Sequence, residues 1–357
     1  MLGTITATGA VTSVGLTASA SCAAIRSGVA RPSPIETQVV DADTQELVQL
    51  TGHPIAGYTD GFQALGRWIR LASGAVADLL RQPGVPPFAD ARFWGRTAML
   101  LVTSEPDEEV LLLDRASALR ALQEDYAGML RKTLGLPIQP KLVPHGQAGA
   151  VLGLESVLGK ARTDIDRVLV LAADSRIDPL LLQKLGMEGR LKTDEDPTGL
   201  MPGEAGAAFL LDCTPGGRTK EPRSDAALLA VGSASEPAEQ SDRPPCSGRG
   251  VASCVGKVLD THPSGDRFEG DMVLDLNGED WRARDWGSAL VRLGHRIGAV
   301  RAFLPATSLG DTGAASGVLG VCLAVHLLRR GVARRDLLVV SRNEAGATGC
   351  LAIRTLA

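Results

Sequence analysis

Short runs of consecutive apolar residues alternate along the chain with longer segments in which apolar residues recur every three to four positions. The short runs predict buried strands, and the longer spacing predicts helices with an apolar face. In the first half of the chain the predicted helices are residues 108–133 and 149–160. The predicted strands of this half are residues 3–11, 97–103, 141–144, 167–172 and 205–212.

The same alternation returns in the second half. Here the pattern predicts helices at residues 251–261, 286–297 and 313–330, and strands at residues 226–232, 271–276, 300–304, 337–340 and 349–354. Apolar strands that alternate with helices favour mostly parallel sheets that helices cover on both faces. We therefore expect an internally duplicated α/β fold, with halves at residues 1–213 and 226–357 and a polar, proline-rich linker at residues 214–225.

Composition and charge narrow the classes of function. The formal net charge is -4, and no basic stripe with interleaved aromatic residues is present, which argues against nucleic-acid binding. The longest apolar stretch, near residues 318–328, is too short to span a membrane, and the N-terminus does not resemble a signal peptide. The six cysteines are scattered, as reduced core residues are, so we expect a cytoplasmic protein with no metal or other cofactor.

One segment, HGQAGAVLGL at residues 145–154, predicts a strand that turns sharply into a helix. In many enzymes such a turn, called an elbow below, places a nucleophile at the positive end of a helix dipole. Here the residue at the elbow is Gln147, and a side-chain amide is not a nucleophile. The turn therefore has the shape of a catalytic feature without its reactive group.

Four further stretches carry a family resemblance. They are GAVTSVGLTASASCAAIRSG at residues 9–28, GLMPGEAGAAFLL at 199–211, TSLGDTGAASG at 307–317 and SRNEAGATGCLAI at 341–353. Their order and spacing resemble the β-ketoacyl-ACP synthases, which are condensing enzymes of the thiolase fold. The resemblance implies a duplicated αβαβα layered fold with mixed, mostly parallel five-stranded sheets, and a two-fold dimer.

The resemblance also implies three site positions. Enzymes of this family take up the acyl group on a cysteine thiolate at the elbow, and two histidines stabilise the enolate and thioester oxygens. Gln147 aligns with the cysteine, Asn277 with the first histidine and Asp311 with the second. Asp285 matches an aspartate that follows the first histidine, and Ala306 replaces a lysine upstream of the second.

The three positions allow more than one interpretation. Gln147 can hydrogen-bond within a closed former pocket, and Asn277 and Asp311 can form a polar network with it or bind a small ligand. His145 is more typical of a structural residue than of a replacement base, and Glu204 is expected to pair locally. Residues 342–345 stand where the family has a glycine turn beside its acyl tunnel, so we expect long acyl chains to bind poorly.

These substitutions predict a catalytically inactive protein. An anionic Asp311 beside a developing enolate raises the energy of that enolate, which opposes the decarboxylation step. Glutamine also occupies the elbow in the chain-length-factor subunits of aromatic polyketide synthases, which pair with an active ketosynthase. The alternative is a divergent acyltransferase or condensing enzyme acting on acyl thioesters, in which Ser308, Thr312 or His145 supplies a rebuilt site.

An inactive member of such a family is expected to act through protein partners. One interpretation is a pseudo-ketosynthase subunit, and another is an adaptor or chaperone such as those encoded beside bacterial secretion effectors. We expect a homodimer, or a heterodimer with a thiolase-fold or effector protein, joined along the strand at residues 138–143. An acyl carrier protein has weaker support, because Arg329, Arg330, Arg334 and Arg335 form the one dense basic group.

Overall fold

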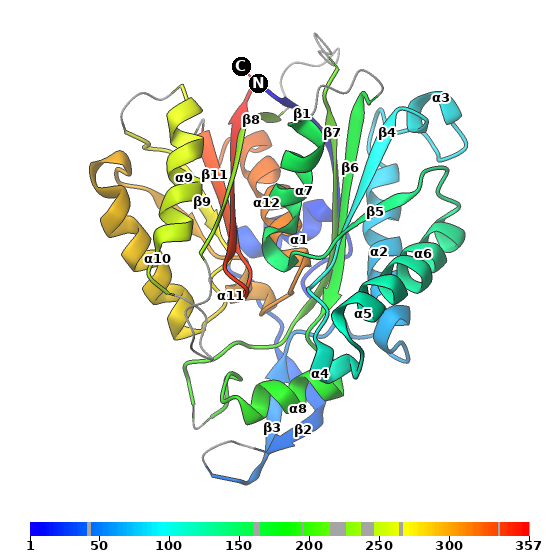
Figure 1. Cartoon of the computed structure of the whole chain (residues 1–357), viewed down its shortest axis with the longest axis vertical. Coiled ribbons are helices and arrows are strands. Elements are labelled where there is room, and N and C mark those ends of the chain that lie inside the picture. The colour runs from blue at the N-terminus through cyan, green and yellow to red at the C-terminus, as the bar shows by residue number, and fades with distance from the viewer. Residues whose placement is uncertain are drawn as a thin grey trace.

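The structure is a computed structural model, and it describes residues 1–40, 44–159, 165–194, 196–214, 226–236, 246–263, 267–334 and 336–356. Ten of the described strands form one continuous sheet, and helices cover it on both sides (Figure 1). Apart from Thr214, the predicted linker lies outside the described residues, as does Arg335 of the basic group.

Five strands from the first part of the chain form one half of the sheet. From the centre of the sheet to its edge they are β1 (Gly3–Thr12), β7 (Glu204–Asp212), β6 (Arg167–Ser175), β4 (Thr97–Val102) and β5 (Pro140–Val143). β4 is parallel to β5 and β6, whereas β7 is antiparallel to β1 and β6. Of these strands, β4, β6 and β7 are almost wholly buried, which explains their continuous apolar sequences.

Five strands from the second part repeat this arrangement. From the centre outwards they are β8 (Ala226–Ser235), β12 (Ala347–Thr355), β11 (Asp336–Arg342), β9 (Asp271–Leu274) and β10 (Arg301–Phe303). β9 is parallel to β10 and β11, whereas β12 is antiparallel to β8 and β11. Counted along each half, the strand order and the strand directions are identical, as an internal duplication requires.

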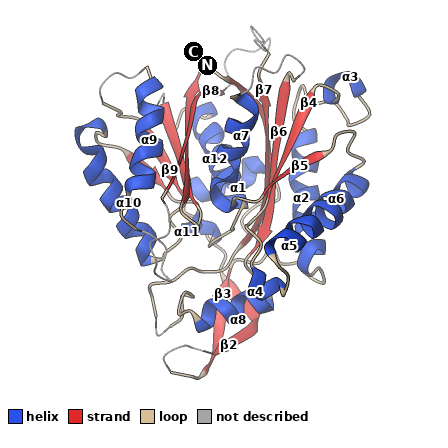
Figure 2. Cartoon of the chain, in the orientation of Figure 1, coloured by secondary structure: helices blue, strands red, loops and turns tan. Residues whose placement is uncertain are grey.

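The two halves of the sheet are joined at one end. Gly3 pairs with Leu228 and Ile5 with Ala226, so β1 and β8 share a short antiparallel ladder. Beyond it the two sets of strands diverge, and a layer of helices fills the space between them (Figure 2). The predicted layered α/β fold with mixed five-stranded sheets is therefore confirmed, with the addition that the two sheets are continuous at this join.

Helices form three layers around the strands (Figure 2). The central layer contains α1 (Ala18–Arg26), α7 (Gly149–Leu158) and α12 (Ala315–Arg329). The outer face of the first half is covered by α2 (Ala64–Leu80), α5 (Arg115–Ala121) and α6 (Ala127–Leu134), and that of the second half by α9 (Arg249–Thr261) and α10 (Asp280–Leu293). Two short helices, α3 (Ala91–Trp94) and α11 (Ala306–Leu309), complete the main body.

The central layer contains the core of the molecule. α12 is buried around its whole circumference, as a helix that is apolar on every side must be. Its apolar residues pack with strands of both halves in one cluster that includes Val318, Leu323, Phe209 and Val339. No helix in the described part of the chain combines the length and the apolar character needed to cross a membrane.

A small lobe projects from the main body, at the bottom of Figure 1. It contains the hairpin of β2 (Ser33–Val40) and β3 (Leu47–Gly52) together with α8 (Pro179–Met187). These elements share a small apolar core of their own, which includes Ile35, Leu50 and Leu182. None of the three was predicted, since β2 and β3 are short and largely exposed and β2 contains a proline.

The single helix predicted at residues 108–133 is wrong. The structure divides it into α4 (Glu108–Leu111), α5, a π-helical turn at Leu122–Tyr126, and α6. Leu112 adopts a left-handed conformation (φ 54°) that no helix interior tolerates. Asp114 then caps a new helix by accepting a hydrogen bond from the Ser117 N–H over 3.0 Å.

Two other boundaries differ from the predictions. The helix predicted at residues 286–297 begins earlier, at Asp280, where an acidic first turn suits the helix dipole. It ends at Leu293, because Gly294 has a positive φ of 53°. α2 lies outside the predicted elements, although Leu71, Ala75 and Leu79 follow helical spacing in its sequence.

Candidate functional site

The elbow is built as the sequence predicts. β5 ends at Val143, Gly146 takes a left-handed conformation (φ 53°), and a single 3₁₀ turn at Gly146–Ala148 leads into α7. Gln147 therefore stands on the turn between strand and helix. Gly317 of α12 packs so closely against it that a Cβ there would lie 2.1 Å from the Gln147 carbonyl oxygen. The close approach fixes the elbow against the central helix.

A loop from the second half faces the elbow. It runs from α11 through Asp311 to α12, and Gly310 and Gly313 supply positive φ angles of 66° and 55°. The loop is held to the stretch before β7, because the Asp311 N–H donates to the Met201 carbonyl over 2.8 Å and the Gly203 N–H donates to the Asp311 carbonyl over 3.0 Å. Two of the motifs that carry the resemblance therefore lie side by side.

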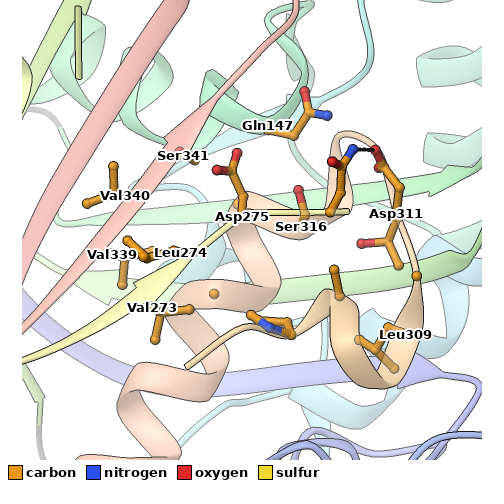
Figure 3. A pocket seen from close by; sticks show the side chains of 17 residues that line it. Gln147, Val273, Leu274, Asp275, Leu309, Asp311, Ser316, Val339, Val340 and Ser341 are labelled. Atoms are coloured by element: carbon orange, nitrogen blue, oxygen red, sulfur yellow. Dashed lines mark hydrogen bonds between the residues drawn. The ribbon is translucent and has the colours of Figure 1, made fainter. Parts of the chain in front are cut away.

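Asn277 follows β9 and completes the site. Its Nδ2 donates to Oδ2 of Asp311 over 2.6 Å, the dashed line beside Asp311 in Figure 3, and to Oε2 of Glu279 over 2.9 Å. Gln147, Asn277 and Asp311 line one cavity of about 20 Å³, which is room for about one water molecule. The structure therefore brings together the three positions that the sequence singled out.

The carboxylate of Asp311 is stabilised as an anion. Burial raises its pKa, but nearby Arg176 and Arg282 and the hydrogen bond from Asn277 outweigh that effect, so the pKa lies below its ordinary value. The Gly313 N–H donates to Oδ1 over 2.7 Å, and Arg176 Nε lies 3.6 Å from the same oxygen. A negative charge therefore persists where the family resemblance places a histidine.

A network of ion pairs, partly buried, adjoins Asp311, and the Glu344 side chain in it is 35% exposed. Arg190 Nε lies 2.7 Å from Glu279 Oε1, and Arg190 Nη1 lies 3.0 Å from Glu344 Oε2. Arg176 also pairs with Glu344, whose Oε1 lies 3.4 Å from Arg176 Nη2. Burial raises the pKa of Glu344, but the two arginines outweigh it and hold that pKa at about 2. The arginines come from the first half of the chain and the carboxylates from the second, so the network ties the halves together.

Two further carboxylates, Asp275 and Asp285, pair with Arg282 and Arg342. Burial raises the pKa of Asp275, although Arg282 opposes the shift at 3.4 Å and the Arg342 N–H donates to its Oδ2 over 2.7 Å. Asp285 accepts from the Gly248 N–H over 2.8 Å and pairs with Arg342 Nη1 at 3.0 Å. In the described ranges no group of three or more His, Cys, Asp or Glu side chains is arranged to hold a metal ion.

Solved structures of the same fold cover the whole chain. A type II polyketide synthase acyl-carrier protein in complex with its ketosynthase bound to the hexaketide gives a TM-score of 0.75 at 14% identity, over 99% of this chain and 98% of the other. The ishigamide ketosynthase/chain length factor gives 0.74 at 16% identity, over 100% of both chains. A ketosynthase in complex with its chain length factor from Xenorhabdus doucetiae gives 0.69 at 15% identity, over 99% and 98%.

The chain has the ketosynthase fold. No protein-family model and no curated protein sequence matches it. The fold is therefore established by the shape of the molecule, and its chemistry must be argued from the residues of its own site.

Within this ketosynthase fold, Gln147 is not part of the polar network. Its side chain forms no hydrogen bond with a described residue, although the residue is only 4% exposed. In Figure 3 it stands at the opposite end of the cavity from Leu309 and Val273, and no dashed line joins it to Asn277 or Asp311. The network that was one interpretation of the three residues therefore contains Asn277 and Asp311 alone.

The residues of a rebuilt catalytic site do not converge. Ser308 is fully buried, and its hydroxyl has no hydrogen-bond partner among the described residues. Thr312 lines the small cavity, whereas His145 lies outside that lining and its Nδ1 is 3.9 Å from Glu105. No described histidine lies in the cavity lining to serve as a base for Thr312.

The expectation that Glu204 pairs locally is wrong. Its carboxylate is fully buried and accepts from the Ile55 N–H over 2.8 Å and from Ser175 Oγ over 3.0 Å. It also accepts from the Thr59 hydroxyl and pairs with Arg67 at 3.1 Å. Glu204 thus anchors the segment before α2 to the start of β7.

A larger hollow opens on the other side of Gln147. It is a groove of about 950 Å³ between the small lobe and the main body, lined by parts of β2, α2, α8, the segment after β4 and residues 343–345. Gln147 belongs to the lining of both the small cavity and this groove. The sequence does not reveal the groove, because its lining comes from segments far apart in the chain.

Proposed function

We propose that this chain is a catalytically inactive ketosynthase-like protein that acts through a protein partner. The observation that carries the proposal is Gln147, which stands on a well-formed elbow where a condensing enzyme needs a thiolate. A primary amide has no lone pair of comparable nucleophilicity, so no acyl group is taken up there.

The groups opposite the elbow support the same conclusion. Enolate stabilisation requires hydrogen-bond donors directed at a developing negative charge. Asp311 offers an anion instead, and its lowered pKa keeps that charge at neutral pH. The Asn277 amide N–H donates to Asp311 and Glu279 rather than into the cavity.

The space within the site also argues against an acyl intermediate. The cavity of about 20 Å³ that Gln147 shares with Asn277 and Asp311 does not accommodate a substrate carbonyl together with its chain, so a chain could reach Gln147 only through the groove of about 950 Å³. The turn at residues 343–345 is held by polar contacts, since Asn343 donates to Glu105 over 3.1 Å and Glu344 pairs with two arginines. Long acyl chains are therefore expected to bind poorly.

The partner is either a related subunit or a protein that this chain escorts. Solved neighbours include a ketosynthase with its chain length factor, which supports pairing with a thiolase-fold subunit. β5 is an edge strand of the described sheet and offers a backbone ladder for such pairing. An adaptor or chaperone role is the second candidate, and capture of the tagged chain from its native host separates the two by the identity of the bound protein.

The activity test uses acyl-CoA, acyl-ACP and malonyl-ACP as substrates. Intact-mass spectrometry is expected to show no acyl adduct, and carbon dioxide release from malonyl-ACP is expected to equal that of buffer. An active ketosynthase provides the positive control. An acyl-enzyme adduct, or decarboxylation clearly above buffer, overturns the proposal.

A further inference from the structure

The groove beside Gln147 contains the chain's excess negative charge. Its lining has eight carboxylates and four cationic side chains, a net charge of -4 that equals the formal net charge of the whole chain. The carboxylates are Glu36, Asp60, Glu105, Asp107, Asp174, Asp178, Glu188 and Glu344. The cations are Arg67, Arg176, Lys184 and Arg190.

The cations of the groove are already paired. Arg67 is 3.1 Å from Glu204, and Lys184 is 2.8 Å from Asp107. Arg176 and Arg190 belong to the network described above. Nothing in the lining therefore offers a free positive charge to an anionic ligand.

Three carboxylates in the exposed part of the lining form no ion pair with a described residue. Glu36 and Asp60 are exposed, and Asp178 is partly exposed at the N-cap of α8, where it accepts from the Leu180 N–H over 3.0 Å. Carboxylates that are gathered in a concave surface raise the local concentration of cations. The electrostatics of the groove therefore favour a positively charged occupant.

Gln147 adds an independent indication of a ligand. Gln147 lines the groove and is only 4% exposed. Its side-chain amide has no hydrogen-bond partner in the described part of the chain. Because no described residue pairs with it, the amide is available to an occupant of the groove. An amide offers both a donor and an acceptor, which complements the N–H and C=O of a peptide group.

The lining of the groove also includes two exposed leucines. Leu111 of α4 and Leu180 of α8 both belong to the lining and are 45% and 64% exposed. Exposed leucines beside a groove are typical of surfaces that a partner covers. They suit apolar side chains that alternate with basic ones.

We propose that this groove binds a basic, extended segment of a protein partner. Lysine or arginine side chains pair with Glu36, Asp60 and Asp178, a peptide group hydrogen-bonds with Gln147, and apolar side chains cover Leu111 and Leu180. The inference rests on the proposed partner function and adds the chemistry of the partner. It also assigns Gln147 a role in binding.

Fluorescence anisotropy tests the groove with two labelled peptides, one that alternates lysine with valine and one that alternates glutamate with valine. The intact chain is expected to bind the lysine peptide at least about tenfold more tightly, and more weakly as salt rises. Failure to bind the lysine peptide, or equal binding of the two peptides, overturns the proposal.

Two triple variants test whether the lysine peptide binds in the groove. Glu36→Gln, Asp60→Asn and Asp178→Asn combined are expected to weaken binding about tenfold and to reduce its salt dependence, while asparagine keeps the cap of α8. Glu46→Gln, Glu124→Gln and Asp125→Asn combined remove the same charge from exposed residues outside the lining, and binding is expected to stay unchanged. An equal effect of the two triple variants contradicts the assignment.

Two further experiments test the role of the Gln147 amide and whether the occupant is a peptide or a free polyamine. Gln147→Met is expected to weaken the lysine peptide about fivefold without lowering the melting temperature, because the amide has no partner in the free chain. Competition with spermidine distinguishes a peptide from a free polyamine, and displacement at equal concentration overturns the peptide assignment. Acyl-adduct formation tests inactivity alone, so the groove and the proposed function can fail independently.

Discussion

Asn277 and Asp311 lie 34 positions apart in the sequence and are joined by a hydrogen bond of 2.6 Å at the centre of the candidate site. The pair shares a small cavity with Gln147, which stands on the turn between β5 and α7. Asp311 is further held by Gly313 and by Arg176, so its charge is balanced within the protein. Arg176 belongs to the first half of the chain and Asp311 to the second, so this ion pair joins the two halves.

Removal of the Asp311 carboxylate is expected to destabilise the fold. Asp311→Ala leaves Arg176 and the Asn277 amide without a main partner, and loss of one member of a buried pair lowers the free energy of unfolding by about 3–5 kcal/mol. Urea unfolding followed by circular dichroism measures the change. Asp280→Asn breaks an exposed pair with Arg284 and is expected to change stability by less than about 1 kcal/mol. Similar effects of the two variants would show that the Asp311 network contributes little.

Restoring a thiol at the elbow is not expected to restore chemistry. Gln147→Cys supplies the nucleophile, but Asn277 and Asp311 still provide no donor for the enolate oxygen. We expect no condensation product and no decarboxylation of malonyl-ACP, measured by mass spectrometry and carbon dioxide release. Turnover by this single variant would show that Asn277 and Asp311 are not the obstacle.

The loss of folding stability at acid pH is expected to depend on Glu344. Burial opposes its charge, but Arg176 and Arg190 hold its pKa at about 2, below the ordinary value of 4.5. A lowered carboxyl pKa stabilises the fold above the ordinary value, and this stabilisation is lost as the pH falls toward 2. Glu344→Gln is therefore expected to be less stable at neutral pH and to lose less stability on acidification.

Urea midpoints measured across that pH range check the prediction for Glu344. The control is Glu269→Gln, because Glu269 is an exposed carboxylate 3.7 Å from an exposed arginine, Arg267. Its curve is expected to run parallel to that of the unaltered chain. Parallel curves for Glu344→Gln as well would contradict the role assigned to Glu344.

The sequence predicts the inner strands and the central helices α7 and α12 because they are largely buried. The sequences of β6 and α12 are apolar on every side, and such a sequence itself indicates that the element is buried. The elbow and the Asp311 loop were also predictable, since small residues such as Gly317 mark close approaches of the backbone. The same reasoning fails for exposed elements such as β2 and β3.

The charge network could not be predicted from the sequence. Its members, such as Arg176 and Glu344, are more than a hundred positions apart, and each follows or precedes a strand as many solvated residues do. The sequence gives one local indication of this network, which is that Arg176 directly follows the buried strand β6. Pairing across the two halves is a property of the fold and has no periodicity to reveal it.

The predicted seam strand is an open edge in the described structure. β5 is the last strand of its half of the sheet, and β4 is its one neighbour in the described strand order. An open edge presents unpaired backbone groups, which natural proteins cover or blunt. Pro140 and Lys141 blunt this edge in part, and Lys141 lies against Ser156 at 3.0 Å. Of the other two positions, Leu142 is half-buried, whereas the Val143 carbonyl already accepts hydrogen bonds from the Thr103 and His145 N–H groups.

We therefore expect the isolated chain to form a homodimer through β5, in which the ladder of one copy continues into that of the other. Interfaces of this kind belong to the class that buries several thousand Å², so the dimer is expected to persist at micromolar concentration. Light scattering should then give twice the chain mass of 37.2 kDa. Hydrogen exchange at Lys141 and Leu142 should be slow in the dimer and should quicken on dilution. A monomer with fast exchange along β5 would exclude the homodimer, and the edge would then be reserved for a different subunit.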